Sequence, residues 1–165
     1  MLDIGITGHQ NFEGISDTSW LKHELSTRIG QLKDIRLGYS SLAIGADVLF
    51  AETLLLMEIS FTAVIPCKNY DATFSEFYRN HYHYLLSKSK EKIFMDFSHP
   101  DEEAFFAAGK FIAEHSDILF VLWDGRPAKG VGGTGDVFEY ALKQKTKVVH
   151  INPWIQETQI YNGME

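Results

Sequence analysis

The sequence predicts an α/β fold: a single Rossmann-like three-layer sandwich with a mostly parallel sheet. Short apolar runs alternate with longer segments of helical period along the whole chain. Residues 117–122 are almost wholly apolar, as a central parallel strand is when helices cover both faces of the sheet. The length of 165 residues suits one domain, so we expect residues 1–165 to form a single Rossmann-like domain.

Three strands and two helices are expected in the first half of the chain. The first strand closes at Gly8, and Pro66 stops the third. Between them, leucine and isoleucine recur every three or four residues from Leu21 to Leu32, the spacing of an amphipathic helix. A second segment is apolar and long enough to be a helix against the sheet. The expected strands are residues 2–7, 35–39 and 61–65, and the expected helices are residues 17–33 and 46–60.

In the second half, cap signals mark where the helices begin. Thr73 followed by Glu76 has the spacing of a capping box, and Pro100-Asp101 opens another helix. The expected helices are residues 73–89, 100–115 and 133–144, and the expected strands are residues 93–95, 117–122 and 147–151. This alternation predicts right-handed βαβ crossovers, with ligands bound at the carboxyl ends of the strands near the topological switch point.

Composition narrows the location and the partners. The net charge is −7 and the fifteen basic residues are scattered, whereas binding by counterion release needs a dense basic surface, so we expect nucleic acid to be an unlikely partner. The single cysteine, Cys67, excludes an internal disulfide and a multi-cysteine metal site. No apolar run approaches the roughly 20 residues of a membrane span, and the N-terminus does not resemble a signal peptide, so we expect a cytoplasmic protein.

Three loops that follow strands are candidates for chemistry: residues 7–11, 40–47 and 123–136. The third has four glycines between Gly130 and Gly135, directly before a helix. Glycine lets the backbone approach a ligand, and the free N–H groups at a helix N-terminus favour an anion. Thr134, Arg126 and Lys129 add a hydroxyl and positive charge, so we interpret this segment as a phosphate-binding loop. The alternative is a mobile surface loop.

The standard nucleotide signatures are absent from the sequence. No G-x-G-x-x-G follows the first strand. Gly125 and Gly130 have the spacing of a P-loop, but Val131 stands where that motif needs lysine. Neither a conventional dehydrogenase nor a P-loop NTPase fits.

Taken together, these loops resemble the SLOG superfamily of Rossmann-like proteins, which contains the LOG proteins and the DNA-processing DprA/Smf proteins. The matching segments are Gly8-His9-Gln10 and residues 41–47, 66–68 and 132–136. The resemblance spans residues 3 to about 153. It implies a nucleotide or nucleotide-derived ligand across these loops and, in some members, sensing of a nucleotide messenger.

LOG enzymes cleave the N-glycosidic bond of nucleoside 5′-monophosphates with a G-G-x-G-T-x-x-E motif. Residues 132–139 match its glycines, and Glu139 matches its glutamate, but Asp136 replaces the threonine. A carboxylate there repels a phosphate, although it suits a ribose diol. Glu139 is the candidate catalytic residue, stabilising an oxocarbenium-like sugar. Its alternative role is an ordinary first-turn glutamate favoured by the helix dipole.

Other candidate residues have both functional and structural interpretations. His9 either hydrogen-bonds a phosphate or ribose or packs its loop, and Trp123 either stacks on a base or belongs to the core. Asp47 is expected to cap its helix. His81 and His83 point to different sides of a helix, so no metal site is expected. Pocket lining or packing suits Cys67 better than a catalytic role, because no histidine partner is evident.

The aromatic stripe 77–85 is too aromatic for an exposed face, and we interpret it as core plus a subunit contact in a homo-oligomer. We expect a module that binds a nucleotide or nucleotide-derived small molecule, without a metal, a cofactor or a membrane, and the resemblance includes a sensor as one role. The alternative function is a nucleoside 5′-monophosphate N-glycosidase. The expected ligand-binding residues are Gly8, His9, Ser41, Ala43, Gly45, Asp47, Trp123, Lys129, Gly132, Gly133, Thr134 and Asp136.

Overall fold

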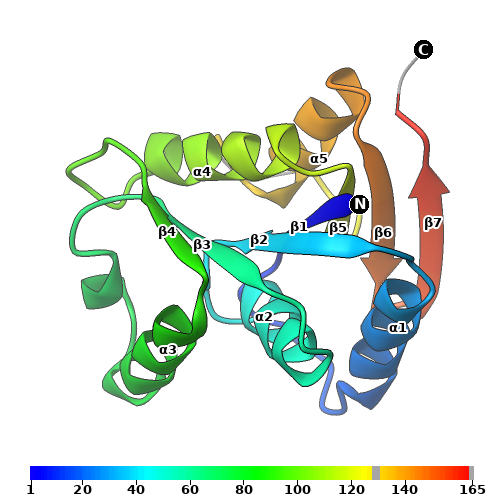
Figure 1. The fold of residues 1–165 in the computed structure, drawn as a ribbon, viewed down its shortest axis with the longest axis horizontal. Coiled ribbons are helices and arrows are strands. Elements are labelled where there is room, and N and C mark those ends of the chain that lie inside the picture. Colours follow the sequence, from blue (N-terminus) through cyan, green and yellow to red (C-terminus); the bar gives the residue numbers. More distant parts are fainter. Residues whose placement is uncertain (128–130, 164–165) are drawn as a thin grey trace.

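The computed structural model describes residues 1–127 and 131–163, and within them seven strands form one sheet between two layers of helices (Figure 1). The strand order is β4-β3-β2-β1-β5-β6-β7, and all neighbours are parallel except β6 and β7. This confirms the predicted α/β class. The strands are β1 (Leu2–Gly8), β2 (Ile35–Ser40), β3 (Phe61–Ile65), β4 (Glu91–Phe94), β5 (Ile118–Leu122), β6 (Lys147–Asn152) and β7 (Glu157–Tyr161).

The helices cover both faces of the sheet. Figure 1 shows α4 and α5 on one face and α1, α2 and α3 on the other. Their bounds are α1 (Ser19–Gly30), α2 (Ala46–Leu56), α3 (Glu76–Lys88), α4 (Glu102–Glu114) and α5 (Thr134–Lys143), with a short 3₁₀ helix, η1, at Tyr70–Thr73.

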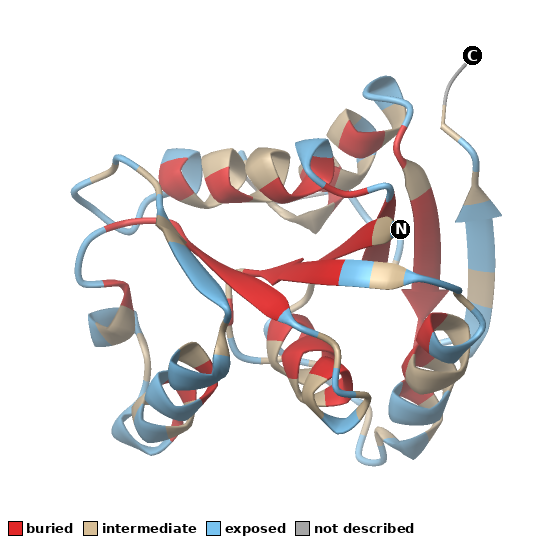
Figure 2. Ribbon diagram, in the orientation of Figure 1, coloured by how far each residue is buried: buried red, intermediate tan, exposed pale blue. Residues whose placement is uncertain are grey.

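Two cores lie on either side of the sheet, and alternate residues of β5 enter each of them. Phe120 and Leu122 pack with the residues of α1 and α2, whereas Leu119 and Val121 pack with those of α4 and α5. All four side chains are completely buried, and the central strands are red along most of their length in Figure 2. Because both faces of β5 are covered, its sequence is a continuous apolar run rather than an alternating one.

The strand order reverses at β1. Its neighbour β2 follows directly through α1, while β5, on its other side, comes after three more helices. The loops after β1 and β5 therefore diverge to opposite faces of the sheet at its carboxyl edge. This is the switch point at which open α/β sheets leave room for a ligand.

Strand β7 was not expected, and it is the sheet's antiparallel edge. It pairs with β6 from Val148↔Tyr161 to Asn152↔Glu157. Its side chains are exposed or half-buried, so the segment carries no alternating apolar pattern that would reveal it.

Helix ends also differ from the prediction, and at two of them the structure gives the reason. Helix α2 stops at Leu56, not at Ser60, because Glu58 takes a left-handed φ of 57° and the Ile59 N–H bonds back to the Leu54 carbonyl at 2.9 Å. Helix α3 is capped by Ser75, whose hydroxyl accepts the Tyr78 N–H at 3.3 Å. Thr73 belongs to η1, so the predicted capping box is wrong.

The structure provides no membrane-spanning helix: within residues 1–127 and 131–163, none is both long enough and apolar enough to cross a bilayer.

Candidate functional site

A cleft of about 950 Å³ runs along the carboxyl edge of the sheet, where the predicted loops meet. Its walls come from the loops after β1, β2, β3 and β5, the turn after β6, and residues of α4 and α5. Nine predicted binding residues line it: Gly8, His9, Ser41, Ala43, Asp47, Trp123, Gly132, Gly133 and Thr134. Lys129, also predicted, lies outside the described residues.

Two glycines allow the loop after β1 and the loop after β2 to pack closely against each other. A Cβ on Gly8 would lie 2.5 Å from the Ala46 Cβ, and one on Gly45 would lie 2.4 Å from the His9 carbonyl oxygen. Gly45 also has a φ of +94°, which L side chains rarely adopt. Gly45 is not among the described residues that line the cleft, so its visible role is close packing of the two loops.

Asp47 orients the second loop from inside. Its Oδ2 accepts the Ala43 N–H at 3.3 Å, in the segment that precedes α2. The predicted cap of α2 is wrong, because the N-cap residue is Gly45 and no side chain caps that end. Asp47 is buried, and burial raises its pKa to about 7 although backbone N–H groups of Ala43 and Ser41 act in the opposite direction.

The glycine loop before α5 is shaped by Gly132, not by Gly133. Gly132 has a φ of +86°, and a Cβ there would lie 2.6 Å from the Glu102 carbonyl oxygen. Gly133 is the N-cap of α5 with an extended φ of −69°, which any residue can adopt. Gly133 and Thr134 line the cleft at the positive end of this helix.

Asp136 and Glu139, the two α5 carboxylates predicted as site residues, are not among the described residues that line the cleft. Asp136 accepts the Gly132 N–H at 2.8 Å and so holds the glycine loop. Glu139 is exposed. Asp136 is therefore engaged with its own loop, and the catalytic role of Glu139 stays a prediction that the cleft geometry does not support.

Trp123 forms part of the cleft floor while belonging to the core. It is 8% exposed and packs against Phe138, with ring centroids 5.2 Å apart, and against His150 at 5.3 Å. The His150 Nε2 hydrogen-bonds the Trp123 carbonyl oxygen at 2.9 Å. Trp123 is therefore both a core residue and part of the cleft lining, and its stacking on a base stays a prediction.

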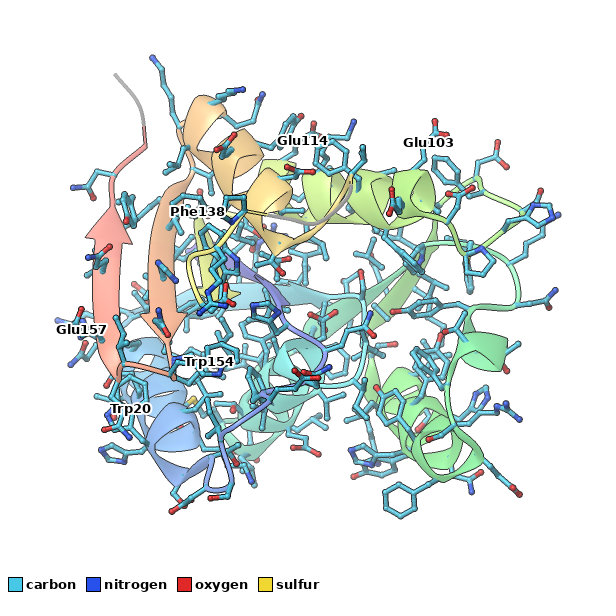
Figure 3. The ribbon with its side chains drawn as sticks, turned by 180° about the vertical axis from the view of Figure 1, so that it is seen from behind. Trp20, Glu103, Glu114, Phe138, Trp154 and Glu157 are labelled. Atoms are coloured by element: carbon cyan, nitrogen blue, oxygen red, sulfur yellow. The ribbon has the colours of Figure 1, made fainter. Side chains whose placement is uncertain are left out.

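One end of the cleft includes Trp154, which was not among the residues predicted from sequence. Figure 3 shows Trp154 beside the turn from β6 to β7. Its ring meets the His9 imidazole edge-on, with centroids 5.2 Å apart, and its indole N–H donates to the Glu13 carbonyl at 2.8 Å. Asp124 lies opposite, with Oδ1 3.4 Å from His9 Nε2. Trp154 lies in the turn before β7. Because the sequence did not predict β7, it did not predict that this tryptophan lines the cleft.

Charge in the cleft is mostly negative among the described residues. The lining includes four carboxylic side chains and one arginine: Glu13, Asp47, Glu102, Asp124 and Arg126. Burial works to raise the pKa of Asp124, but the Arg126 N–H, His9 and the Arg126 guanidinium together keep that pKa below its usual value. The cleft therefore suits ligands of low charge better than highly charged ones.

The remaining candidates lie away from the cleft or are buried. His81 and His83 pair separately, with Glu52 at 2.8 Å and Asp71 at 3.2 Å, and no group of three metal-ligating side chains occurs within the described residues. Burial raises the pKa of the Cys67 thiol, which disfavours the reactive thiolate. In the aromatic stripe, Tyr78, Tyr82 and Leu85 are buried, whereas Phe77 and Tyr84 are exposed.

Neither a protein-family model nor a curated protein matches the chain. Solved structures do match it. The X-ray structure of DNA processing protein A (DprA) from Streptococcus pneumoniae superposes with a TM-score of 0.65 and 16% identity, over 91% of this chain and 50% of that one. The chain has a DprA-like fold. It spans half the length of that DprA chain, and the likeness confirms the Rossmann-like fold that the SLOG resemblance implied.

A second DprA, from Helicobacter pylori, gives the same TM-score of 0.65 and 16% identity, over 96% of this chain and 68% of that one. That structure concerns a unique single-stranded DNA binding mode of its protein. The expectation that nucleic acid is an unlikely partner is therefore wrong. Net charge argues only against a wide basic groove that releases many counterions, because composition does not show where the basic residues lie on the surface.

Proposed function

We propose that this protein binds a nucleotide in the cleft, with its phosphate at the N-terminus of α5 and its base against an aromatic side chain. The observation that carries the proposal is the cleft itself, at the switch point of a parallel sheet and lined by nine of the residues predicted from sequence. Gly133 and Thr134 supply backbone N–H groups and a hydroxyl where the helix dipole favours an anion.

Single-stranded DNA is the second candidate, because the Helicobacter pylori neighbour binds it. A single strand offers the same chemistry as a free nucleotide: a phosphate for the helix end and a base for an aromatic platform. The N-glycosidase alternative lacks a comparable observation, since Glu139 is exposed on α5.

Substitution at Gly133 tests the phosphate position with two side chains of nearly the same shape. The extended backbone of Gly133 is one that any residue can adopt, and both aspartate and asparagine are good N-cap residues. Gly133→Asp places a negative charge in the proposed anion site, whereas Gly133→Asn has nearly the same shape without the charge. The aspartate variant should bind nucleoside monophosphates ten- to a hundredfold more weakly than the asparagine variant, the value of about 1.5–3 kcal/mol for a charge-assisted hydrogen bond.

Calorimetric titration with a nucleotide panel and with oligo(dT) provides the measurement, after thermal melts confirm that both variants fold. The corresponding nucleosides serve as ligand controls, because they lack the phosphate. If the two variants bind monophosphates equally, the phosphate does not occupy the helix end. If the wild type binds neither nucleotides nor oligo(dT), the proposed function is wrong.

A further inference from the structure

The cleft has an aromatic platform at each end. At one end stands Trp154, after β6, and at the other stands Phe105, from the first turn of α4, beside Tyr70 of η1. The sheet order separates β3, which leads to η1, from β6 by β2, β1 and β5. Four strand spacings of 4.7–4.9 Å place those strand ends about 19 Å apart. A single nucleotide has one base and can use only one platform.

Both platforms are held in place by their neighbours. Trp154 is fixed by its indole hydrogen bond to Glu13 and by a 3.0 Å bond from its own N–H to Asn152 Oδ1. Phe105 is half-buried, with its ring 6.3 Å from that of Tyr70. Phe105 and Tyr70 also border an adjoining recess of about 470 Å³, which extends this end of the cleft. Rings held in this way can receive a base without reordering.

The loop to α5 leaves the sheet at β5, which lies between β3 and β6 in the strand order. The proposed phosphate position therefore falls between the two platforms. This is the order of groups in two nucleosides joined by a phosphodiester: base, phosphate, base.

The charge of the cleft favours the same ligand. A phosphate monoester carries about −1.5 to −2 at pH 7, whereas each phosphodiester of a strand carries a single negative charge. A dinucleoside monophosphate therefore carries one negative charge for two bases. Glu13, Glu102 and Asp124 outnumber the one arginine of the described lining, so this lining repels that ligand less than it repels a mononucleotide.

We propose that the cleft binds a dinucleotide unit, two nucleosides joined by one phosphodiester, with one base on Trp154 and the other on Phe105. The inference rests on the proposed function and names its ligand class. The unit comes either from a free dinucleotide or from two adjacent residues of a DNA single strand, because both present the same groups.

Titration of the wild-type chain with matched ligands tests the number of bases. TpT and ApA should bind more tightly than TMP and AMP by about five- to a hundredfold, the contribution of a second base on an aromatic platform. Trp154→Leu and Phe105→Leu keep apolar volume but remove the ring, and each should reduce the affinity for TpT and ApA to that for the mononucleotides. Phe77→Leu is the matched control, since Phe77 is 93% exposed and lies outside the cleft.

The outcomes separate this inference from the proposed function. Mononucleotides binding as tightly as dinucleotides, or leucine variants that retain the dinucleotide advantage, would overturn the inference alone. A wild type that binds no ligand of the panel overturns both. Oligo(dT) of increasing length then distinguishes the sources: affinity that is constant beyond two nucleotides indicates a free dinucleotide, and affinity that rises with length indicates a strand.

Discussion

Asp47 is a buried carboxyl group whose protonation is linked to stability. Burial raises its pKa to about 7 in the folded protein, whereas an exposed aspartate has a pKa near 3.8. Between those two pH values the folded chain holds a proton that the unfolded chain releases. The free energy of unfolding contributed by this group therefore falls as the pH rises from about 4 to 7, and changes little above that.

Asp47→Asn removes this titration while keeping an oxygen that can accept the Ala43 N–H. The stability of the variant relative to the wild type should therefore increase from pH 4 to pH 7, by up to about 4 kcal/mol for a shift of about three pH units. Urea unfolding of both proteins at a series of pH values gives the difference directly. Groups such as Glu24 and Asp124, whose pKa values are lowered, cancel because both proteins contain them. A difference that does not vary with pH contradicts the linkage.

Individual site residues could be predicted where a local rule applies. Gly8 ends β1 and His9 follows it, and that position alone brings them to the cleft. The sequence does not show which glycine of the Gly132-Gly133 pair takes a positive φ, because that depends on tertiary contacts. Here the α4 backbone at Glu102 leaves no room for a side chain on Gly132.

At the scale of elements, side-chain caps set where the helices begin. Asp101 is the N-cap of α4, and its Oδ1 accepts the Ala104 N–H at 2.9 Å. This helix carries Glu102 and Phe105 to the cleft. Asp101→Ala should lower the free energy of unfolding by about 0.5–2 kcal/mol, because the amide loses its acceptor. Asp101→Asn retains the acceptor and should stay close to the wild type in the same chemical denaturation experiment. Equal losses in both variants would mean that charge, not capping, is the important property.

The elements with strong apolar periodicity were predicted well, and those fixed by tertiary contacts were not. β5 and α2 bury large apolar faces, so their existence is clear from sequence. β7 is an edge strand that needs only the ladder of β6, and its exposed side chains follow no pattern. The end of α2 at a left-handed Glu58 lacks the glycine that usually marks such an end. Trp154 was not among the predicted site residues because it lies in the turn before β7, which was not predicted.

At the scale of the whole molecule, the negative net charge affects how a nucleic acid would bind. The net charge is −7, and the described cleft lining has a single arginine. A nucleic acid bound by stacking and one phosphodiester contact loses less affinity as the salt concentration rises than one bound in a basic groove. Composition could not distinguish the stacking mode from the basic-groove mode. It gives the number of charges but not the positions of the aromatic side chains relative to the strand ends.

Salt therefore provides the last prediction. For single strands, the logarithm of the binding constant falls with the logarithm of salt concentration with a slope of about −0.7 for each phosphate neutralised. One phosphate contact predicts that oligo(dT) affinity falls only about fivefold for a tenfold rise in salt, whereas six contacts would lower it by about ten-thousandfold. Fluorescence anisotropy of labelled oligo(dT) at 50 to 500 mM salt measures the slope. Arg126→Gln, which removes the one arginine of the described lining, should leave a slope that is flatter still if that guanidinium neutralises the phosphate, and an unchanged slope if the α5 backbone holds it alone. A slope several times steeper in the wild type would place the strand on a basic surface outside this cleft.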